Sequence, residues 1–376
     1  MEKFSAFRDP GTGIQPFLPP VPPLENDPFV AILLPIRSIL FILRTFVVVV
    51  IAVLYYGLHY GLCTLLIPIP LLRRLAEGLC TRLLARLALY ILGFAHVHEE
   101  IVTRKRGRKL HEMPWNPQAG DIIVSNWTSW VDVLWIAYRF NPIFVMPVVE
   151  EPKPSVPVDA SVPLSYRPGR NKVHGASTTS VLTRTTKSRS AINGFHPVSL
   201  FAMIQAAGHT PEKLSSTVVL PLQELRRSAQ RPIVIFPECT TSNGRGLLRF
   251  AEVFQGFDVP VKQFNVFIMC IRYDPPTSRR SSPSHPIASS SLNPLRHLFA
   301  LLSSLSPQLM SVRMLPLSES PSSQLFMVNE VISEPTIDTL SEICAILMAR
   351  IGKMKQVCFG WEDKINFLDL YWSSRR

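Results

Sequence analysis

The residues best suited to chemistry stand at positions 236–246, Phe-Pro-Glu-Cys-Thr-Thr-Ser-Asn-Gly-Arg-Gly, directly after the apolar run 233–235. A β-branched run closed by proline and small polar residues is typical of a buried strand that ends in a polar loop. In this loop Glu238 can accept hydrogen bonds, and Arg245 can bind a phosphate group with two parallel hydrogen bonds. The loop therefore favours an anionic ligand, although an ordinary turn after a core strand has the same pattern.

A second polar loop has the sequence Asn-Trp-Thr-Ser-Trp-Val-Asp at residues 126–132. It follows a short apolar run at residues 121–125 and precedes a helical pattern. This order places the loop at the carboxyl end of a strand, which is the usual position of a ligand site in an open α/β sheet.

The elements that position these loops alternate between short apolar strands and helical patterns. Such an alternation favours an α/β domain with a mixed, largely buried sheet flanked by helices. Further strands are predicted at residues 143–146, 264–271 and 325–332, helices at 198–207, 221–228, 295–305 and 339–353, and a polar connection at 96–109.

The composition favours a protein that works at a lipid surface. Of the 376 residues 47% are hydrophobic, and the formal net charge is +12. This charge suits an anionic membrane or anionic substrates, whereas no nucleic-acid-binding motif is present, so nucleic acid is not expected as a partner. The six cysteines are scattered without metal-ligand spacing, so no metal site is expected and most should be buried thiols.

Residues 29–97 are predicted to form a membrane anchor. The stretch 45–70 lacks Asp, Glu, Lys and Arg, and it exceeds the roughly 20 residues that span a bilayer as a helix. Arginines flank it on both sides, so a single span and a re-entrant hairpin both remain open. Leucines at helical spacing in residues 71–94, with arginines between them, predict either an interfacial helix or a helix packed on the core.

Two other segments lack apolar periodicity. Residues 1–28 are rich in proline and are predicted to be a disordered arm. Residues 150–193, within the domain 98–376, are predicted to be a flexible insertion rich in Ser, Thr and Arg.

The two polar loops, 126–132 and 236–245, resemble the paired signatures NHxxxxD and FPEGTRS of the glycerophospholipid acyltransferases. The resemblance covers roughly residues 29–275, and the sequence TTSNGR at 240–245 and the tail 360–364 resemble a fungal branch similar to lysophosphatidic acid:oleoyl-CoA acyltransferases. It implies an acyltransferase-type α/β domain behind a hydrophobic anchor. Two motifs in this order are more specific than either one alone.

The chain departs from the family at the chemical centre. Trp127 stands where the family has the histidine that removes a proton from the acceptor hydroxyl, and indole cannot act as a base. Cys239 replaces a turn glycine, and Thr241 replaces an arginine that holds phosphate, a charge that Arg245 could supply. A replacement base would come from elsewhere, for example His196, or from water.

The resemblance implies a membrane-bound 1-acylglycerol-3-phosphate O-acyltransferase-like enzyme with acyl-CoA, a lysophospholipid and membrane lipid as partners and no further cofactor. The expected location is the endoplasmic reticulum membrane or lipid droplets, with the motif domain facing the cytosol. The alternative is an inactive acyltransferase-fold protein that binds lipid or acts as an adaptor. The expected catalytic residue is Asp132, and the expected substrate-binding residues are Asn126, Ser129, Glu238, Thr240, Asn243, Gly244 and Arg245.

Overall fold

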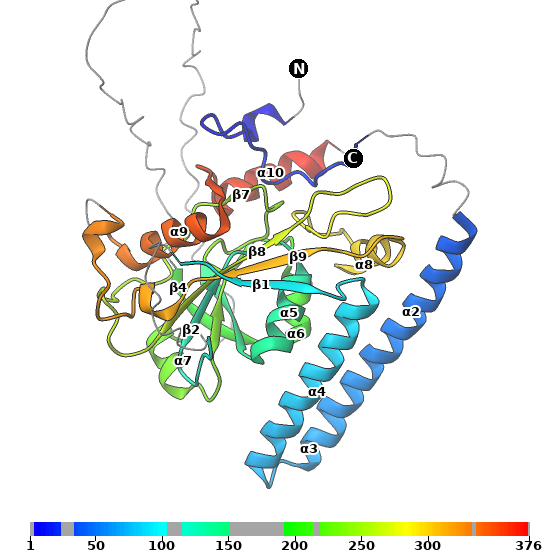
Figure 1. Cartoon of the computed structure of the whole chain (residues 1–376), viewed down its shortest axis with the longest axis horizontal. Coiled ribbons are helices and arrows are strands. Elements are labelled where there is room, and N and C mark those ends of the chain that lie inside the picture. Colours follow the sequence, from blue (N-terminus) through cyan, green and yellow to red (C-terminus); the bar gives the residue numbers. More distant parts are fainter. Residues whose placement is uncertain are drawn as a thin grey trace, which may run out of the picture.

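The structure is a computed structural model that describes residues 4–23, 34–103, 115–149, 192–213, 219–332 and 336–374. It has a central mixed sheet with helices on both faces, and two long helices, α2 and α4, project from one side (Figure 1). The expected α/β class with a flanked mixed sheet is therefore confirmed. The helices are α2 (Leu34–Tyr56), α3 (Cys63–Leu65), α4 (Pro70–Ile91), α5 (Trp130–Phe140), α6 (Leu200–Ala206), α7 (Leu222–Ser228), α8 (Leu295–Leu302), α9 (Thr339–Gly352) and α10 (Trp361–Ser373), with a π-helix η2 (Gly57–Leu62) and the short 3-10 helices η1 (Ser5–Phe7), η3 (Leu317–Glu319) and η4 (Val328–Glu330).

The main sheet has the strand order β1-β9-β8-β2-β6-β3-β4, and the short β5 pairs with β3. The four central strands β8, β2, β6 and β3 run parallel, whereas β9 and β4 run antiparallel to β8 and β3. The carboxyl ends of the parallel strands therefore lie at one edge, as a ligand site in this class requires. The strands are β1 (Val97–Ile101), β2 (Ile122–Ser125), β3 (Ile143–Val149), β4 (Ile192–Val198), β5 (Glu212–Lys213), β6 (Ile233–Ile235), β8 (Val266–Tyr273) and β9 (Met310–Met314), and β7 (Gly246–Leu247) pairs with β10 (Lys355–Gln356) in a second small sheet.

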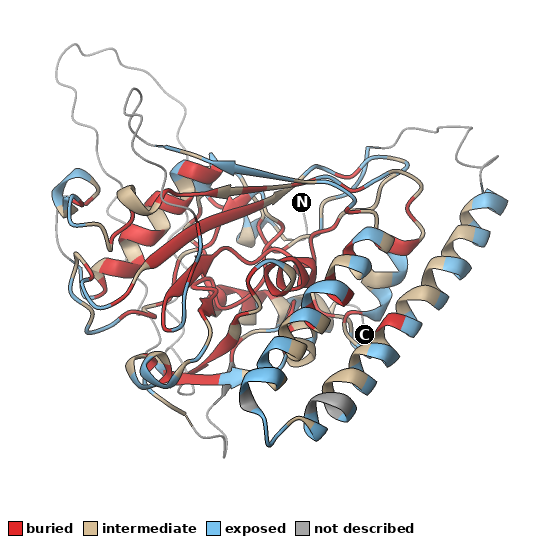
Figure 2. Ribbon diagram, turned by 60° about the horizontal axis from the view of Figure 1, so that its bottom comes forward, coloured by how far each residue is buried: buried red, intermediate tan, exposed pale blue. Residues whose placement is uncertain are grey.

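The sheet is buried on both faces because helices cover each one. Successive residues of a strand point to opposite faces. Accordingly, Ile122 and Val124 join the hydrophobic cluster that contains α9, whereas Ile123 joins the cluster that contains α5. Figure 2 shows the strands as largely buried, while the projecting helices are mostly intermediate or exposed. The continuous apolar runs in the sequence follow from this two-sided burial.

The apolar segment 45–70 does not form one straight helix. Helix α2 starts earlier, at Leu34, continues through η2 and α3, and ends before Pro68 and Pro70, which lack the N–H that a helix needs. Helix α4 then runs back beside α2 (Figure 1). Within the described residues one stretch, Leu34–His59, is long and apolar enough to cross a membrane, and little of it is buried.

The N-terminal segment differs from the expected disordered arm over its described part, residues 4–23. Phe17 is 1% exposed and packs against Phe359 and Phe367, with ring centroids 6.1 and 5.4 Å away. The carboxylate of Asp9 accepts the N–H of Cys358 at 2.8 Å. Proline-rich composition does not prevent order here, because the aromatic side chains of the segment find an apolar surface on the C-terminal part of the chain.

Two local predictions about strands and loops were wrong, and one strand was missed. Residues 325–332 contain the 3-10 helix η4 instead of a strand, and the polar segment 96–109 contains the edge strand β1. Strand β9 was not predicted, because its five residues alternate between buried and half-buried positions and include Arg313. Residues 150–191 of the expected insertion lie outside the described residues, and its last residues, 192 and 193, begin β4.

Candidate functional site

The carboxylate of Glu238 joins the two polar loops. Strands β2 and β6 are parallel neighbours, so the loops that follow them leave the sheet side by side. Glu238 is fully buried, and its oxygens accept the backbone N–H groups of Trp127 at 2.7 Å and Leu248 at 2.8 Å. Buried N–H groups need acceptors, so this carboxylate satisfies the backbone of both loops. We expected Glu238 to bind substrate, but in the structure its side chain is directed into the protein.

Asp132 lies in the first turn of α5, and both of its oxygens accept hydrogen bonds. Oδ2 accepts the N–H groups of Thr128 at 2.7 Å and Ser129 at 2.8 Å. The Ser129 hydroxyl accepts the N–H of Val131 in return, which completes a capping box. Oδ1 accepts the hydroxyl of Tyr273 from the end of β8. Ser129 is thus a helix cap and not an exposed ligand contact.

Trp127, at the position of the family's histidine, belongs to the core. It is 2% exposed and stacks on Phe236, with ring centroids 5.0 Å apart and the ring planes at 25°. Its indole N–H has no hydrogen-bond partner in the described part of the chain. Since indole only donates, Trp127 stabilises the contact between the two loops by packing and cannot remove a proton.

Asn126 extends the sheet instead of contacting a ligand. Its Oδ1 accepts the N–H of Ile271 at 2.7 Å, and its Nδ2 donates to the carbonyl of the same residue at 2.9 Å. This pair of hydrogen bonds imitates a strand partner for β8. Both ends of the amide are thus bonded to β8, and substrate binding by Asn126 stays a prediction.

Lys364 of α10 holds the turn that follows β6. Its Nζ donates to Oγ1 of Thr240 at 2.7 Å and to the carbonyl of Thr241 at 2.8 Å, and Thr240 donates to the carbonyl of His209 at 2.6 Å. We expected Thr240 to bind substrate, but in the structure it is fully buried. Cys239 has φ 55°, which explains why the resembled motif uses glycine at this position.

Asn243 binds the N-terminal segment. Its Nδ2 donates to the carbonyls of Gln15 at 2.7 Å and Leu18 at 2.9 Å, and its N–H donates to the carbonyl of Pro16 at 2.8 Å. Its Oδ1 accepts the N–H of Arg245 at 3.1 Å. Because these bonds occupy the amide, Asn243 ties the loop to the N-terminal segment.

A cleft of about 230 Å³ lies at this edge of the sheet, with Thr128, Gly244, Arg245, Arg272 and Tyr273 among its lining residues. We call it the basic cleft, because its two arginines outnumber the one carboxylate in its described lining, Asp274, which pairs with Arg280 at 3.5 Å. Gly244 has φ 72°, and a Cβ there would lie 2.9 Å from Cγ2 of Thr128, so the close approach of the two loops requires glycine. Arg245 is exposed. Within the described residues its guanidinium has no hydrogen-bond or ion-pair partner. The cleft can therefore receive an anion.

An apolar groove of about 360 Å³ lies on the other side of the loop 126–132. It runs between α5 and the helices α2 and α4, with Val48, Leu84, Trp130, Leu134 and Ile204 among its lining residues. Thr128 lines the basic cleft and Trp130 lines the apolar groove. A single loop thus separates a polar site from an apolar one.

Burial also shifts the proton affinity of the central carboxyl groups. It raises the pKa of Asp132 to about 7, although the hydrogen bonds from Tyr273 and two N–H groups oppose this shift. Burial likewise raises the pKa of Glu238 to about 8. Lys364 is equally buried, and burial lowers its pKa. Asp132 can therefore exchange a proton near neutral pH.

Two histidines that contact the loop 126–132 or the start of α5, His285 and His297, are already hydrogen-bonded within the protein. His285 Nε2 lies 2.8 Å from Oδ1 of Asn293, and His297 Nδ1 accepts the indole N–H of Trp130 at 2.8 Å. Burial lowers the pKa of His285 to about 3 and that of His297 to about 4, so both are weak bases. His196, the base that we considered from the sequence, lies on the edge strand β4, three strands away from β2.

Sequence reasoning missed Tyr273, Arg272 and the role of Lys364. Arg272 and Tyr273 directly follow the apolar run 264–271, so the rule that polar residues at a strand's carboxyl end form sites could have found them. Lys364 lies in the tail 360–364 that carries part of the resemblance, but no local pattern connects it with the loop that it holds, more than 120 residues earlier.

In the described residues no group of three or more His, Cys, Asp and Glu side chains could hold a metal ion. The chain matches no family model, no curated protein and no solved structure.

Proposed function

We propose that this protein is a membrane-bound acyltransferase that transfers a fatty acyl group from acyl-CoA to lysophosphatidic acid or a related lysophospholipid. The observation that carries the proposal is the position of the loop 126–132 between a basic cleft and an apolar groove. Both substrates join an anionic group to an apolar chain, so the reaction needs sites of both kinds close together. The net charge of +12 also favours two anionic substrates.

The basic cleft binds the phosphate of the acceptor. Arg245 offers an uncommitted guanidinium, whose two parallel N–H groups match a phosphate. Arg272 adds a second positive charge, although its Nη1 also donates to the carbonyl of Gly352 at 2.9 Å. Of the residues that we expected to bind substrate, only Asn243, Gly244 and Arg245 line this cleft.

The apolar groove binds a fatty acyl chain. Its lining residues are mainly apolar, and it begins at Trp130, two residues after Thr128 of the cleft. A chain that lies in the groove would bring a thioester at its end close to the acceptor in the cleft. Holding two reactants in this way can by itself supply an effective molarity on the order of 10⁵ M or more.

Tyr273 and Asp132 supply the proton transfer. The Tyr273 side chain lines the cleft, and its hydroxyl donates to Oδ1 of Asp132. As the acceptor hydroxyl attacks the thioester carbonyl, a C–O bond forms and its proton passes to the Tyr273 oxygen, while the Tyr273 proton passes to Asp132. The C–S bond then breaks, and the leaving CoA thiolate takes back one proton by the same route. A carboxyl with a pKa of about 7 suits this role at neutral pH.

The proposal includes a location. Helices α2 and α4 attach the protein to the endoplasmic reticulum membrane or to lipid droplets, with the sheet domain in the cytosol where acyl-CoA is found. The exposed apolar side chains of α2, such as Ile39, Ile42 and Phe46, support this attachment. They would be costly in water and are typical of a lipid-facing surface.

One observation favours the second candidate function, an inactive acyltransferase-fold protein that binds lipid or acts as an adaptor. Trp127 is buried and stacked, and the polar side chains around it bond mainly to the protein's own backbone. This closed arrangement needs no catalysis to explain it. The groove and the cleft would then serve lipid binding alone.

Acyl transfer by the purified full-length protein in detergent tests the proposal. Labelled oleoyl-CoA is supplied with lysophosphatidic acid, and labelled phosphatidic acid is measured for the wild type and for Asp132→Ala. We expect turnover in the wild type and a loss of at least a hundredfold in the variant. Absence of turnover with several lysophospholipids would overturn the proposal in favour of the lipid-binding function.

Asp338→Ala is the matched control for this variant. Asp338 is also a buried aspartate that caps a helix, since its oxygens accept the N–H groups of Ser341 at 2.9 Å and Phe254 at 2.8 Å. It caps α9 on the other face of the sheet. Equal losses in both variants would show that Asp132 serves only the fold.

A further inference from the structure

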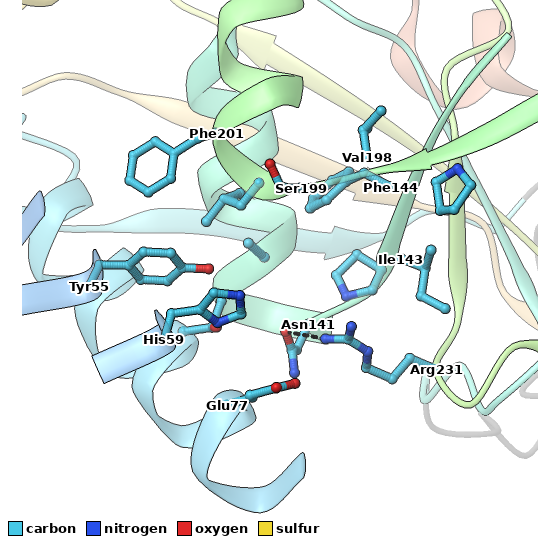
Figure 3. A pocket seen from close by; sticks show the side chains of 15 residues that line it. Tyr55, His59, Glu77, Asn141, Ile143, Phe144, Val198, Ser199, Phe201 and Arg231 are labelled. Carbon is cyan, nitrogen blue, oxygen red and sulfur yellow. Dashed lines mark hydrogen bonds between the residues drawn. The ribbon is translucent and has the colours of Figure 1, made fainter. Parts of the chain in front are cut away.

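A second polar hollow lies at the opposite edge of the sheet from the motif loops. It has a volume of about 330 Å³ and is lined by α4, by the end of α2 and by the residues that precede β3 and β6 (Figure 3). Asn141 follows the last residue of α5, whereas the motif loop precedes its first residue. The 11 residues of α5 therefore separate the two sites by about 16 Å.

The described lining of this hollow includes one arginine, Arg231, and one carboxylate, Glu77, whose charge is neutralised by an ion pair with Arg73. In Figure 3 the side chains of Tyr55 and His59 and the guanidinium of Arg231 extend toward the space between the helices and the sheet. Arg231 donates only one hydrogen bond among the described residues, from Nη1 to Oδ1 of Asn141 at 3.2 Å. The remaining N–H groups of its guanidinium are available to a ligand.

A neighbouring hollow of about 280 Å³ extends the same basic surface. Arg231 and Glu77 line both hollows, and Arg73 and Arg74 line the second. Among the described residues that line the two hollows, Glu77 is the one carboxylate, and Arg73 neutralises it with an ion pair of 2.8 Å. Arg74 and Arg231 thus remain as two charges without a counter-ion among the described residues.

Exposed apolar side chains lie close in the chain to the arginines of this surface, and one of them, Ile67, lines the second hollow. Leu65, Ile67, Leu71 and Leu75, at the turn between α2 and α4, are 57–76% exposed. Arginines beside exposed leucines are typical of the level of the lipid headgroups, where the leucines enter the bilayer and the arginines contact phosphate.

We propose that this surface, formed by Arg74, Arg231 and Asn141, binds the phosphate group of an anionic bilayer phospholipid whose acyl chains lie against the apolar side chains of the α2–α4 turn. The site is distinct from the basic cleft beside Arg245. It fixes the orientation of the domain on the membrane, because it ties the amino-terminal edge of the sheet to the headgroup layer. The inference depends on the membrane attachment in the proposed function and is independent of catalysis.

Lipid titration of the full-length protein in a neutral detergent tests this site. All measurements use the Arg245→Gln variant, so that the proposed substrate cleft does not contribute. The thermal unfolding midpoint is followed against dioctanoyl phosphatidic acid, dioctanoyl phosphatidylcholine and inorganic phosphate. A ligand that binds the folded state raises this midpoint. We expect saturable stabilisation by phosphatidic acid, and at least tenfold weaker binding of the other two compounds.

Second substitutions locate the binding. Arg231→Gln and Arg74→Gln should each weaken binding of phosphatidic acid at least fivefold. Arg74 is exposed, so its variant stays informative if Arg231→Gln does not fold. Arg227→Gln is the matched control, because Arg227 is an exposed arginine on α7 that does not line either hollow. It should leave binding unchanged.

The possible failures are distinguishable. Unchanged binding in both Arg231→Gln and Arg74→Gln, or equal weakening by Arg227→Gln, would overturn the proposed site. Equal stabilisation by inorganic phosphate would also overturn it, since the ligand would then be free phosphate. The wild type could also show no acyl transfer while phosphatidic acid still binds in a way that depends on Arg231. That result would contradict only the proposed function.

Discussion

The hydroxyl of Tyr273 donates a hydrogen bond to Oδ1 of Asp132, so the end of β8 is joined to the loop after β2. Through this contact Asp132 has a partner that lines the basic cleft. Trp127 cannot be such a partner, because it lies in the core. Asp132 is therefore bonded to a tyrosine from a neighbouring strand of the sheet.

Tyr273→Phe should lower the turnover number by roughly 10²–10⁴-fold, the usual contribution of general acid–base assistance. Asp132→Asn should have a similar effect, and the double variant should be no slower than either single one, because the two groups act as a unit. Labelled oleoyl transfer measures this, with Tyr138→Phe on α5 as the control. Full activity in Tyr273→Phe would show that the proton leaves by another route.

Arg245→Ala should weaken binding of lysophosphatidic acid by about 1.5–3 kcal/mol, the range for a hydrogen bond to a charged group. Arg245→Lys should recover only part of this loss, since a point charge does not reproduce two parallel hydrogen bonds. Equilibrium binding in detergent is the measurement, and Arg227→Ala is the control. Equal affinities in wild type and all variants would place the phosphate elsewhere.

The stability of the protein should depend on the ionisation of Asp132. Its pKa of about 7 lies above the value near 4 of an unfolded aspartate, so its contribution to stability is complete below pH 4 and is lost as the pH rises through 7. The lowered pKa values of His285 and His297 act in the opposite direction below about pH 6.5. The difference in unfolding free energy between the wild type and Asp132→Asn isolates the contribution of this carboxyl group.

Thermal unfolding from pH 5 to 8 gives this difference. We expect the wild type to lose stability relative to Asp132→Asn as the pH increases. A difference that does not change with pH would mean that Asp132 is ionised throughout the range.

Trp127→His should not raise turnover, because residue 127 lies in the core against Phe236 and Tyr273 already bonds to Oδ1 of Asp132. The variant should also lose about 2–4 kcal/mol of stability, since a smaller polar ring leaves a cavity beside Phe236. Thermal unfolding and oleoyl transfer are measured together, with Trp127→Phe as a control that keeps the stacking. Faster transfer by Trp127→His would show that Asp132 can orient an imidazole after all.

Phe17→Ala should destabilise the protein by about 3–5 kcal/mol, the range for a buried phenylalanine. Because residues 15–18 also bond to Asn243, the loop that carries Arg245 should become more accessible to protease. Val21→Ala is the control, since Val21 is 76% exposed. Unchanged unfolding of Phe17→Ala would mean that residues 4–23 do not stabilise the domain.

Much of the fold could be predicted because local sequence encodes it. The apolar runs of β2, β6 and β8 and the periodicity of α9 are visible in the sequence, since two-sided burial demands unbroken apolar residues and a buried helix face demands regular spacing. Strands β1 and β9 were missed because neither contains the unbroken apolar run that marks β2, β6 and β8. The order of residues 4–23 was missed because proline content describes the isolated chain and not the surface on which it packs.

The sequence by itself determined that two polar loops follow two buried strands, that an anionic ligand suits the second loop, and that position 127 holds no base. Only the tertiary structure decided how these residues are used. Glu238, Asn126 and Asn243 bond to backbone groups of distant segments, and Tyr273 rather than an imidazole meets Asp132. Hydrogen-bond partners and burial are set by segments far apart in the chain, so no local pattern distinguishes a polar residue that binds a ligand from one that holds the fold.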